Sequence, residues 1–211
     1  MKLYTHPMSS SARRVTLVAA HLGIELDTRT IDLRNRTDRA ALVAVNPNGK
    51  IPVLVTDELT LWEGHAIAQL LCDRAGAKGA ALYPAELIAR ADVNRWLFWV
   101  SAHLAPAVGP ISFEKLWKKL VEGPDAQPDP ALLARYERFL HQAMGVLDKH
   151  LAERAWVVGK TLTVADYSIA ATLMYRAQTQ LPLDAYQNVL ALLGRVEDTA
   201  AWKATEPQRW G

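Results

Sequence analysis

Three short segments in the first third of the chain hold side chains that could bind or activate an anion. In the first, Ser9, Ser10 and Ser11 stand between a strand-like run at 2–5 and the start of a helix. A hydroxyl beside the positive end of a helix can donate a hydrogen bond to an anion and favour it over its protonated form. Serine at this place also caps helices, and three adjacent serines allow both roles.

The second segment is NPNGKIPVL at 46–54, where a proline enters an apolar run. Pro52 cannot donate a hydrogen bond to a neighbouring strand, so it belongs at a strand entrance. A cis Ile51-Pro52 bond would turn the N–H and C=O of Ile51 outward, where they could pair with an extended peptide ligand. An ordinary turn is the simpler interpretation, because only ~5% of such bonds are cis.

The third segment, Trp62-Glu63-Gly64, opens a helix whose free backbone N–H groups could bind a carboxylate. Glu63 could accept an ammonium group from the same ligand. The alternative is that Glu63 only complements the helix dipole.

The elements around these segments predict a small mixed sheet in an α/β domain. We expect strands at 2–5 and 25–33, a hairpin of 51–55 with 59–62, and helices at 12–21, 37–45 and 63–74. The helix between the first two strands makes them parallel, and the hairpin is antiparallel.

The rest of the chain predicts an all-helical domain. An Ala/Gly-rich stretch ending in Tyr83-Pro84 suggests a linker at 76–86 between domains at 1–75 and 87–211. Apolar residues then recur at helical spacing in four stripes. They are Val93, Trp96, Leu97, Val100 and Leu104; Leu133, Tyr136, Leu140, Ala143, Leu147 and Leu151; Val164, Tyr167, Ala171 and Met174; and Tyr186, Val189, Leu193 and Val196.

Composition excludes several classes of protein. Half of the 211 residues are hydrophobic, which excludes disorder as the dominant state. With 24 basic and 22 acidic side chains, the chain lacks the excess charge that nucleic-acid binding requires. No run reaches the ~20 apolar residues of a membrane span, and a single cysteine fits a reducing cytoplasm.

Other motifs carry no chemistry that we would assign. The six histidines show no metal-binding pair, and Gly159-Lys160-Thr161 lacks the glycine that a phosphate loop would need at Arg154. Cys72 stands among apolar residues, so we expect a buried, inert thiol. Thr163 and Asp166 have the spacing of a capping box, which is structural.

As a set, LYTHPMSSSARRV, NPNGKIPVL and LWEGHAIAQLL resemble the glutathione transferase superfamily, particularly its serine-type phi and theta classes. The resemblance implies a thioredoxin-like N-terminal domain with a four-stranded mixed sheet, an all-α C-terminal domain and a cytoplasmic homodimer active in detoxification. It also implies glutathione as co-substrate, a small hydrophobic electrophile, and no metal, nucleic acid or membrane partner.

Site residues follow from the same resemblance. Ser9 would be the catalytic hydroxyl, and glutathione would be bound by Ser11, Lys50, Ile51, Pro52, Glu63 and Gly64. Two positions depart from the family pattern: Gly64 stands where serine is usual, and Thr37 where phi enzymes often have histidine. The electrophile pocket would include Trp99, His103, Phe113 and Trp117, beside Arg95, although aromatic residues at this spacing also form ordinary helix cores.

Three functions stay open at this point. The first is a transferase, in which a hydroxyl and a helix N-terminus lower the thiol pKa of glutathione. Lowering it by two units from ~8.5 requires ~2.7 kcal/mol of preferential anion stabilisation. The second is a non-catalytic protein that binds glutathione or hydrophobic ligands, and the third is a glutathione-dependent reductase of disulfides or peroxides.

Overall fold

The computed structural model describes residues 1–206 and divides into two compact units. The first unit holds Met1–Arg90 together with the described chain from Glu197, and the second holds Ala91–Val196. The stretch expected to be a linker contains a short helix, α4 (Ala77–Leu82). Within the described chain, no helix has both the length and the apolar character of a membrane span.

A four-stranded mixed sheet lies at the centre of the first unit, as predicted. Its strands, in the order β2-β1-β3-β4, are β1 (Lys2–Thr5), β2 (Asp27–Thr30), β3 (Val53–Val55) and β4 (Thr60–Trp62). Leu3 of β1 stands opposite Thr28 in a parallel pair and opposite Leu54 in an antiparallel pair. The hairpin of β3 and β4 is antiparallel and places Val53 opposite Trp62.

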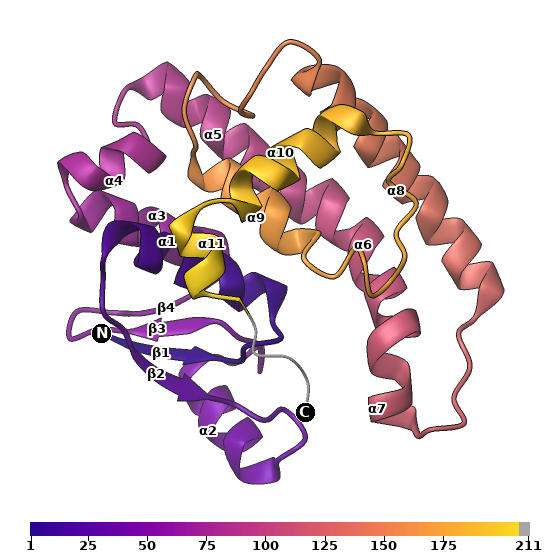
Figure 1. The fold of residues 1–211 in the computed structure, drawn as a ribbon. Helices are drawn as coiled ribbons and strands as arrows, with labels where there is room; N and C mark the ends of the chain where they lie inside the picture. Colours follow the sequence, from indigo (N-terminus) through magenta and orange to yellow (C-terminus); the bar gives the residue numbers. More distant parts are fainter. Residues whose placement is uncertain (207–211) are drawn as a thin grey trace. The chain divides into compact units, whose positions relative to one another are not determined.

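Helices cover both faces of this sheet (Figure 1). Helices α1 (Ser10–Leu22) and α3 (Gly64–Arg74) pack on each other, whereas α2 (Arg36–Val45) contributes Leu42 to a core with Ile31 and Val53. Helix α1 begins earlier than the apolar spacing indicated, because Ser9 caps it. The helix ends at Gly23, whose φ of 70° is left-handed.

The second unit is helical, also as predicted. A nearly continuous helical path runs through α5 (Leu87–Trp99), η1 (Val100–Leu104), α6 (Ala105–Ser112), η2 (Phe113–Trp117) and α7 (Lys118–Glu122). Elements η1 and η2 are π-helical, and Pro110 lies inside α6 without ending it. Short π-helical turns are frequent at functional sites.

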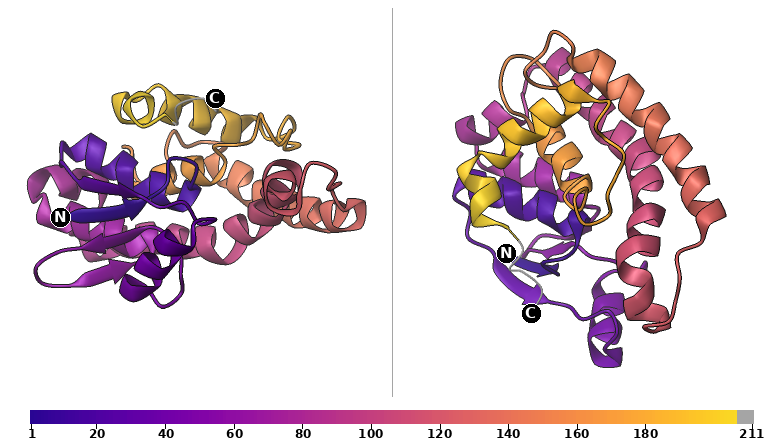
Figure 2. Two further views of the ribbon diagram at one scale, coloured as in Figure 1. Left: turned by 90° about the horizontal axis from the view of Figure 1, so that it is seen from below. Right: turned by 45° about the vertical axis from the view of Figure 1, so that its right-hand side comes forward.

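Four further helices follow this path. They are α8 (Pro130–Leu151), α9 (Val164–Thr172), α10 (Gln187–Glu197) and α11 (Ala200–Ala204). Helix α6 packs along α8, as Figure 2 shows. The capping box is present: the carboxylate of Asp166 accepts the N–H of Thr163 at 2.7 Å. Buried residues include all five members of the first predicted stripe.

Candidate functional site

The hydroxyl of Ser9 caps helix α1 and keeps its own proton available. Its Oγ accepts the N–H of Ala12 at 3.2 Å, and its backbone N–H donates to the carbonyl of His6 at 2.9 Å. The hydroxyl proton of Ser9 and the N–H groups of Ser10 and Ser11 have no acceptor among the described residues. This helix end therefore presents three donors with which an anion could pair.

The segment from Lys50 to Pro52 leads directly into β3. The Ile51-Pro52 bond is cis, and Pro52 is buried while Lys50 is exposed. Asn46 fixes this segment because its Nδ2 donates to the carbonyl of Lys50 at 2.7 Å. The backbone groups of Ile51 have no hydrogen-bond partner in the part of the chain that the structure describes. They can therefore pair with an extended ligand.

Glu63 and Gly64 form a strained turn at the start of α3. Glu63 caps the helix with φ 72°, makes no side-chain bond to it, and is exposed. A positive φ in a residue other than glycine is unfavourable by about 1–3 kcal/mol, and residues with such strain cluster at functional sites. The positive φ thus belongs to Glu63, and Gly64 needs another explanation.

Close approach to helix α1 explains the glycine at position 64. Gly64 is buried, and a Cβ built on it would lie 2.7 Å from the carbonyl oxygen of Ser11. That distance is too short for a carbon atom beside a backbone oxygen. The family's usual serine could fit here only if α1 and α3 moved apart.

We predict that Gly64→Ser destabilises the protein by about 1–3 kcal/mol, since it inserts atoms into a filled space. The hydroxyl should not tighten glutathione binding. Thermal unfolding and calorimetric titration of the variant would measure both effects. Gly145→Ser is the control, because a Cβ at Gly145 meets no atom within 4 Å. An unchanged melting temperature with about tenfold tighter binding would contradict this account.

A buried arginine and a neutral histidine lie behind this turn. Nη1 of Arg14 is 2.5 Å from Nε2 of His65, so the histidine accepts and carries its proton on Nδ1. Burial lowers the pKa of Arg14 to about 10 against the opposing effect of Glu63, which leaves the guanidinium charged at neutral pH. Burial, with the charge of Arg14, lowers the pKa of His65 to about 2. Sequence reasoning missed both residues, whose contact spans 51 positions.

We expect His65 to make stability fall in mild acid. Its pKa is about 2 in the folded protein and ~6.5 when unfolded, so only the unfolded chain takes up a proton between these values. The contribution of His65 to the free energy of unfolding should therefore be constant above pH ~6.5 and fall by up to about 2 kcal/mol by pH ~5. Denaturant unfolding at both pH values should show that the native protein loses up to about 2 kcal/mol more than His65→Gln, in which the other titrating groups are unchanged. Equal acid sensitivity of the two would exclude His65 as the cause.

The aromatic residues expected to bind an electrophile fall into two groups within the helical unit. Trp99 and His103 have ring centroids 6.5 Å apart, and Trp99 also contacts Trp96 at 5.1 Å. Trp117 instead makes an edge contact with Tyr175 at 5.5 Å. Phe113, at the start of η2, is half-buried.

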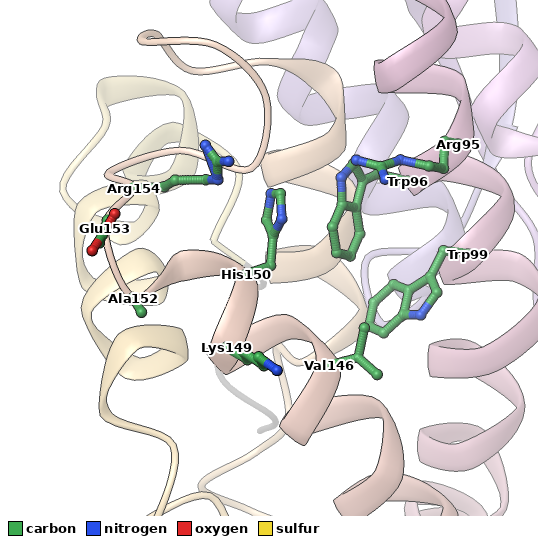
Figure 3. Close-up of a pocket in the computed structure, with 9 residues that line it drawn as sticks. All are labelled: Arg95, Trp96, Trp99, Val146, Lys149, His150, Ala152, Glu153 and Arg154. Atoms are coloured by element: carbon green, nitrogen blue, oxygen red, sulfur yellow. The ribbon is translucent and has the colours of Figure 1, made fainter.

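A groove of about 790 Å³ separates α5 from the end of α8 (Figure 3). The rings of Trp96 and His150 contact each other in its wall, with centroids 4.6 Å apart and planes tilted by 49°. The side chains that line it are Arg95, Trp96, Trp99, Val146, Lys149, His150, Ala152, Glu153 and Arg154. Of the four expected pocket residues, Trp99 lines this groove, and His103, Phe113 and Trp117 do not.

Neither a reactive thiol nor a metal-binding group of side chains is found among the described residues. Cys72 is buried, and burial, with the charge of Asp73, raises its thiol pKa to about 12. The thiol is therefore protonated at neutral pH and is a poor nucleophile. Within residues 1–206, no three His, Cys, Asp or Glu side chains are grouped to hold a metal ion.

Comparison with known proteins identifies the family. Residues 1–72 match the model of the glutathione S-transferase N-terminal domain, and residues 113–204 match a C-terminal domain of the same family. Glutathione S-transferase 3 of Zea mays is 30% identical over 167 residues, which cover 79% of this chain and 73% of the relative. Glutathione S-transferase 2 of Anopheles gambiae is 32% identical over 174 residues, with coverages of 82% and 78%.

Solved structures agree with these sequence matches. The apo form of a glutathione S-transferase III superposes with a TM-score of 0.82 at 28% identity, covering 97% of this chain and 94% of that one. The chain belongs to the glutathione S-transferase family, with a thioredoxin-like N-terminal domain and a helical C-terminal domain. Enzymes of this family use glutathione as co-substrate.

Proposed function

We propose that this transferase is of the serine type, with Ser9 donating a hydrogen bond to the sulfur of glutathione. The state of the Ser9 hydroxyl carries the proposal: its oxygen caps α1, while its proton has no acceptor among the described residues. The sulfur would lie at the positive end of α1, beside the free N–H groups of Ser10 and Ser11. Both features favour the thiolate over the thiol.

The free energy available from the Ser9 hydroxyl and the N-terminus of α1 is large enough to ionise the thiol of glutathione at neutral pH. The thiolate is the nucleophile, and a thiol with a pKa of ~8.5 is only a few per cent ionised at neutral pH. One hydrogen bond to a charged group contributes ~1.5–3 kcal/mol, and a helix N-terminus ~0.3–1 kcal/mol. Together they reach the ~2.7 kcal/mol that lowers the pKa by two units. No general base has to remain in the site.

The rest of the tripeptide would be bound along the edge formed by the other two segments. In this proposal Ile51 pairs through its backbone with the cysteinyl part, next to Pro52, and Lys50 contacts the glycyl carboxylate. The N-terminal N–H groups of α3 bind the glutamyl carboxylate, and Glu63 accepts the glutamyl ammonium. The free Ile51 backbone and the exposed side chains of Lys50 and Glu63 support these roles.

The second substrate would be a small hydrophobic electrophile bound by the helical unit. Two groups of side chains are the proposed contacts: Trp99 with His103, and Phe113 with Trp117. The π-helical elements η1 and η2 carry three of these four residues. Flat apolar molecules suit aromatic walls. Such a pocket would need to orient the electrophile against the thiolate and exclude water.

An activity panel tests the proposal. Purified protein should bind glutathione by calorimetry and catalyse its addition to a generic aryl halide, with the bound thiol ionising well below pH ~8.5. Binding without adduct formation would favour the non-catalytic alternative. Reduction of a model disulfide or peroxide, in place of adduct formation, would favour the reductase. Absence of glutathione binding would contradict the transferase and the reductase, and would leave only a protein that binds hydrophobic ligands.

We further propose that the protein is a homodimer in the cytoplasm. Helix α5 presents an apolar face to solvent: Leu87 is 79% exposed and Phe98 is 73% exposed. With Ala91 these residues recur at helical spacing, and exposed apolar faces of this kind mark interaction sites. Sedimentation of a monomer at micromolar concentration would contradict the dimer.

A further inference from the structure

Arg14 contacts Gly64 and His65, the two residues that follow Glu63 in the turn at the start of α3. Its aliphatic stem packs on Gly64, where a Cβ would lie 3.0 Å from its Cδ and 3.3 Å from its Cγ. Its Nη1 lies 2.5 Å from Nε2 of His65. Glu63 is the carboxylate whose charge acts on the guanidinium. One side chain of α1 thus packs against the first two residues of α3.

The buried position of Arg14 and the backbone conformation of Glu63 both require support from neighbouring groups. Arg14 is only 7% exposed, and a buried guanidinium is retained where hydrogen bonds and an opposite charge compensate it. Glu63 has the left-handed conformation that residues other than glycine rarely adopt. Such a conformation persists where its surroundings determine it in several ways. The contacts of Arg14 are determinants of this kind.

We propose that Arg14 is a positioning residue for glutathione, and that it acts through Glu63 without touching the ligand. By fixing the turn, it directs the Glu63 carboxylate and the N-terminal end of α3 toward the glutamyl end of the tripeptide. This inference rests on the proposed function. Gly64 is needed for this arrangement, because a side chain there would occupy the space that the aliphatic stem of Arg14 fills.

The neighbouring arginine provides a matched control. Arg13 is 5% exposed and lies on the same helix, but it faces α11. Its guanidinium stacks 3.7 Å from the ring centre of Trp202, and its Nη2 donates to the Trp202 carbonyl at 3.3 Å. Arg13→Met therefore removes a buried arginine from α1 without altering the contacts described at the turn.

Calorimetric titration with glutathione tests the role. Arg14→Met should raise the Kd about tenfold, the loss expected for one charge-assisted interaction. The KM for glutathione should rise in parallel, with kcat changed much less, and Arg14→Lys should restore part of the affinity. Arg13→Met should bind glutathione as the native protein does, even where its melting temperature falls. Equal affinities of Arg14→Met and Arg13→Met would overturn the proposal.

A double-mutant cycle tests the route through Glu63. If Arg14 acts by positioning Glu63, Arg14→Met should weaken binding little further in a Glu63→Gln background. Independent, additive losses would overturn this route. If Arg14→Met does not fold, Arg14→Lys enters the cycle in its place. A native protein that failed to bind glutathione would overturn the proposed function and this role together; equal binding by native protein and Arg14→Met would overturn this role alone.

Discussion

Replacing Ser9 with alanine should lower kcat by about one to two orders of magnitude and weaken glutathione binding much less. The hydroxyl is proposed to act on the ionised sulfur, and losing most of ~2.7 kcal/mol of anion stabilisation returns the thiol pKa toward ~8.5. The thiol pKa of the bound tripeptide, followed by ultraviolet absorption of the thiolate against pH, measures this directly. An unchanged pKa in Ser9→Ala would refute the assignment.

Loss of the helix cap is a separate effect of this substitution and has its own control. Ser9 caps α1, so alanine should also lower stability by about 1 kcal/mol. Thr199 caps α11 in the same unit, with its Oγ accepting the Trp202 N–H at 3.2 Å. Thr199→Ala should show a similar loss of stability with normal turnover. Ser9→Thr should restore activity, and Ser11→Ala should do less damage than Ser9→Ala.

Replacing Asp166 with alanine should give the largest loss of stability. Its buried carboxylate accepts the N–H of Val157 at 2.8 Å and both the N–H and the Oγ–H of Thr163, at 2.7 and 2.8 Å. Burial nonetheless raises its pKa to about 6, so desolvation offsets part of this stabilisation. Because alanine leaves buried donors without acceptors, we expect a net loss of about 3 kcal/mol.

Asp129 separates this effect from ordinary helix capping. It also accepts two backbone N–H groups, from Ala131 and Leu132, but it is exposed. Asp129→Ala should lose only about 1 kcal/mol, since water can replace the carboxylate there. Denaturant unfolding measures both variants, and equal losses would show that burial of Asp166 is not decisive. Below its melting temperature, Asp166→Ala should keep its affinity for glutathione.

Features that depend on neighbouring residues could be predicted from the sequence. The mixed sheet, the hairpin, the end of α1 at Gly23 and the capping box of Thr163 all arise from local spacing and turn chemistry. Helix α4 was missed for a physical reason. Its glycines suggested a linker, but Gly79 allows the helix to approach α3: a Cβ there would lie 1.8 Å from the carbonyl oxygen of Cys72.

Features that depend on distant residues could not be predicted. No residue near Arg14 in the sequence indicates that it contacts His65, and the sequence around Glu63 does not predict its positive φ. The sequence shows that Gly64 departs from the family pattern but does not explain why glycine is there. The explanation is the short distance from a Cβ at position 64 to the Ser11 carbonyl, which depends on the packing of α1 on α3.

The contact between Arg13 and Trp202 has a consequence for the order in which the protein is made. A protein is synthesised from its N-terminus, so residues 1–90 emerge from the ribosome long before Trp202 does. Until then, the Arg13 guanidinium lacks the ring that stacks on it and the carbonyl that accepts its hydrogen bond. All of Ala91–Val196 has left the ribosome by that time. The unit whose synthesis starts first is thus the last to be finished.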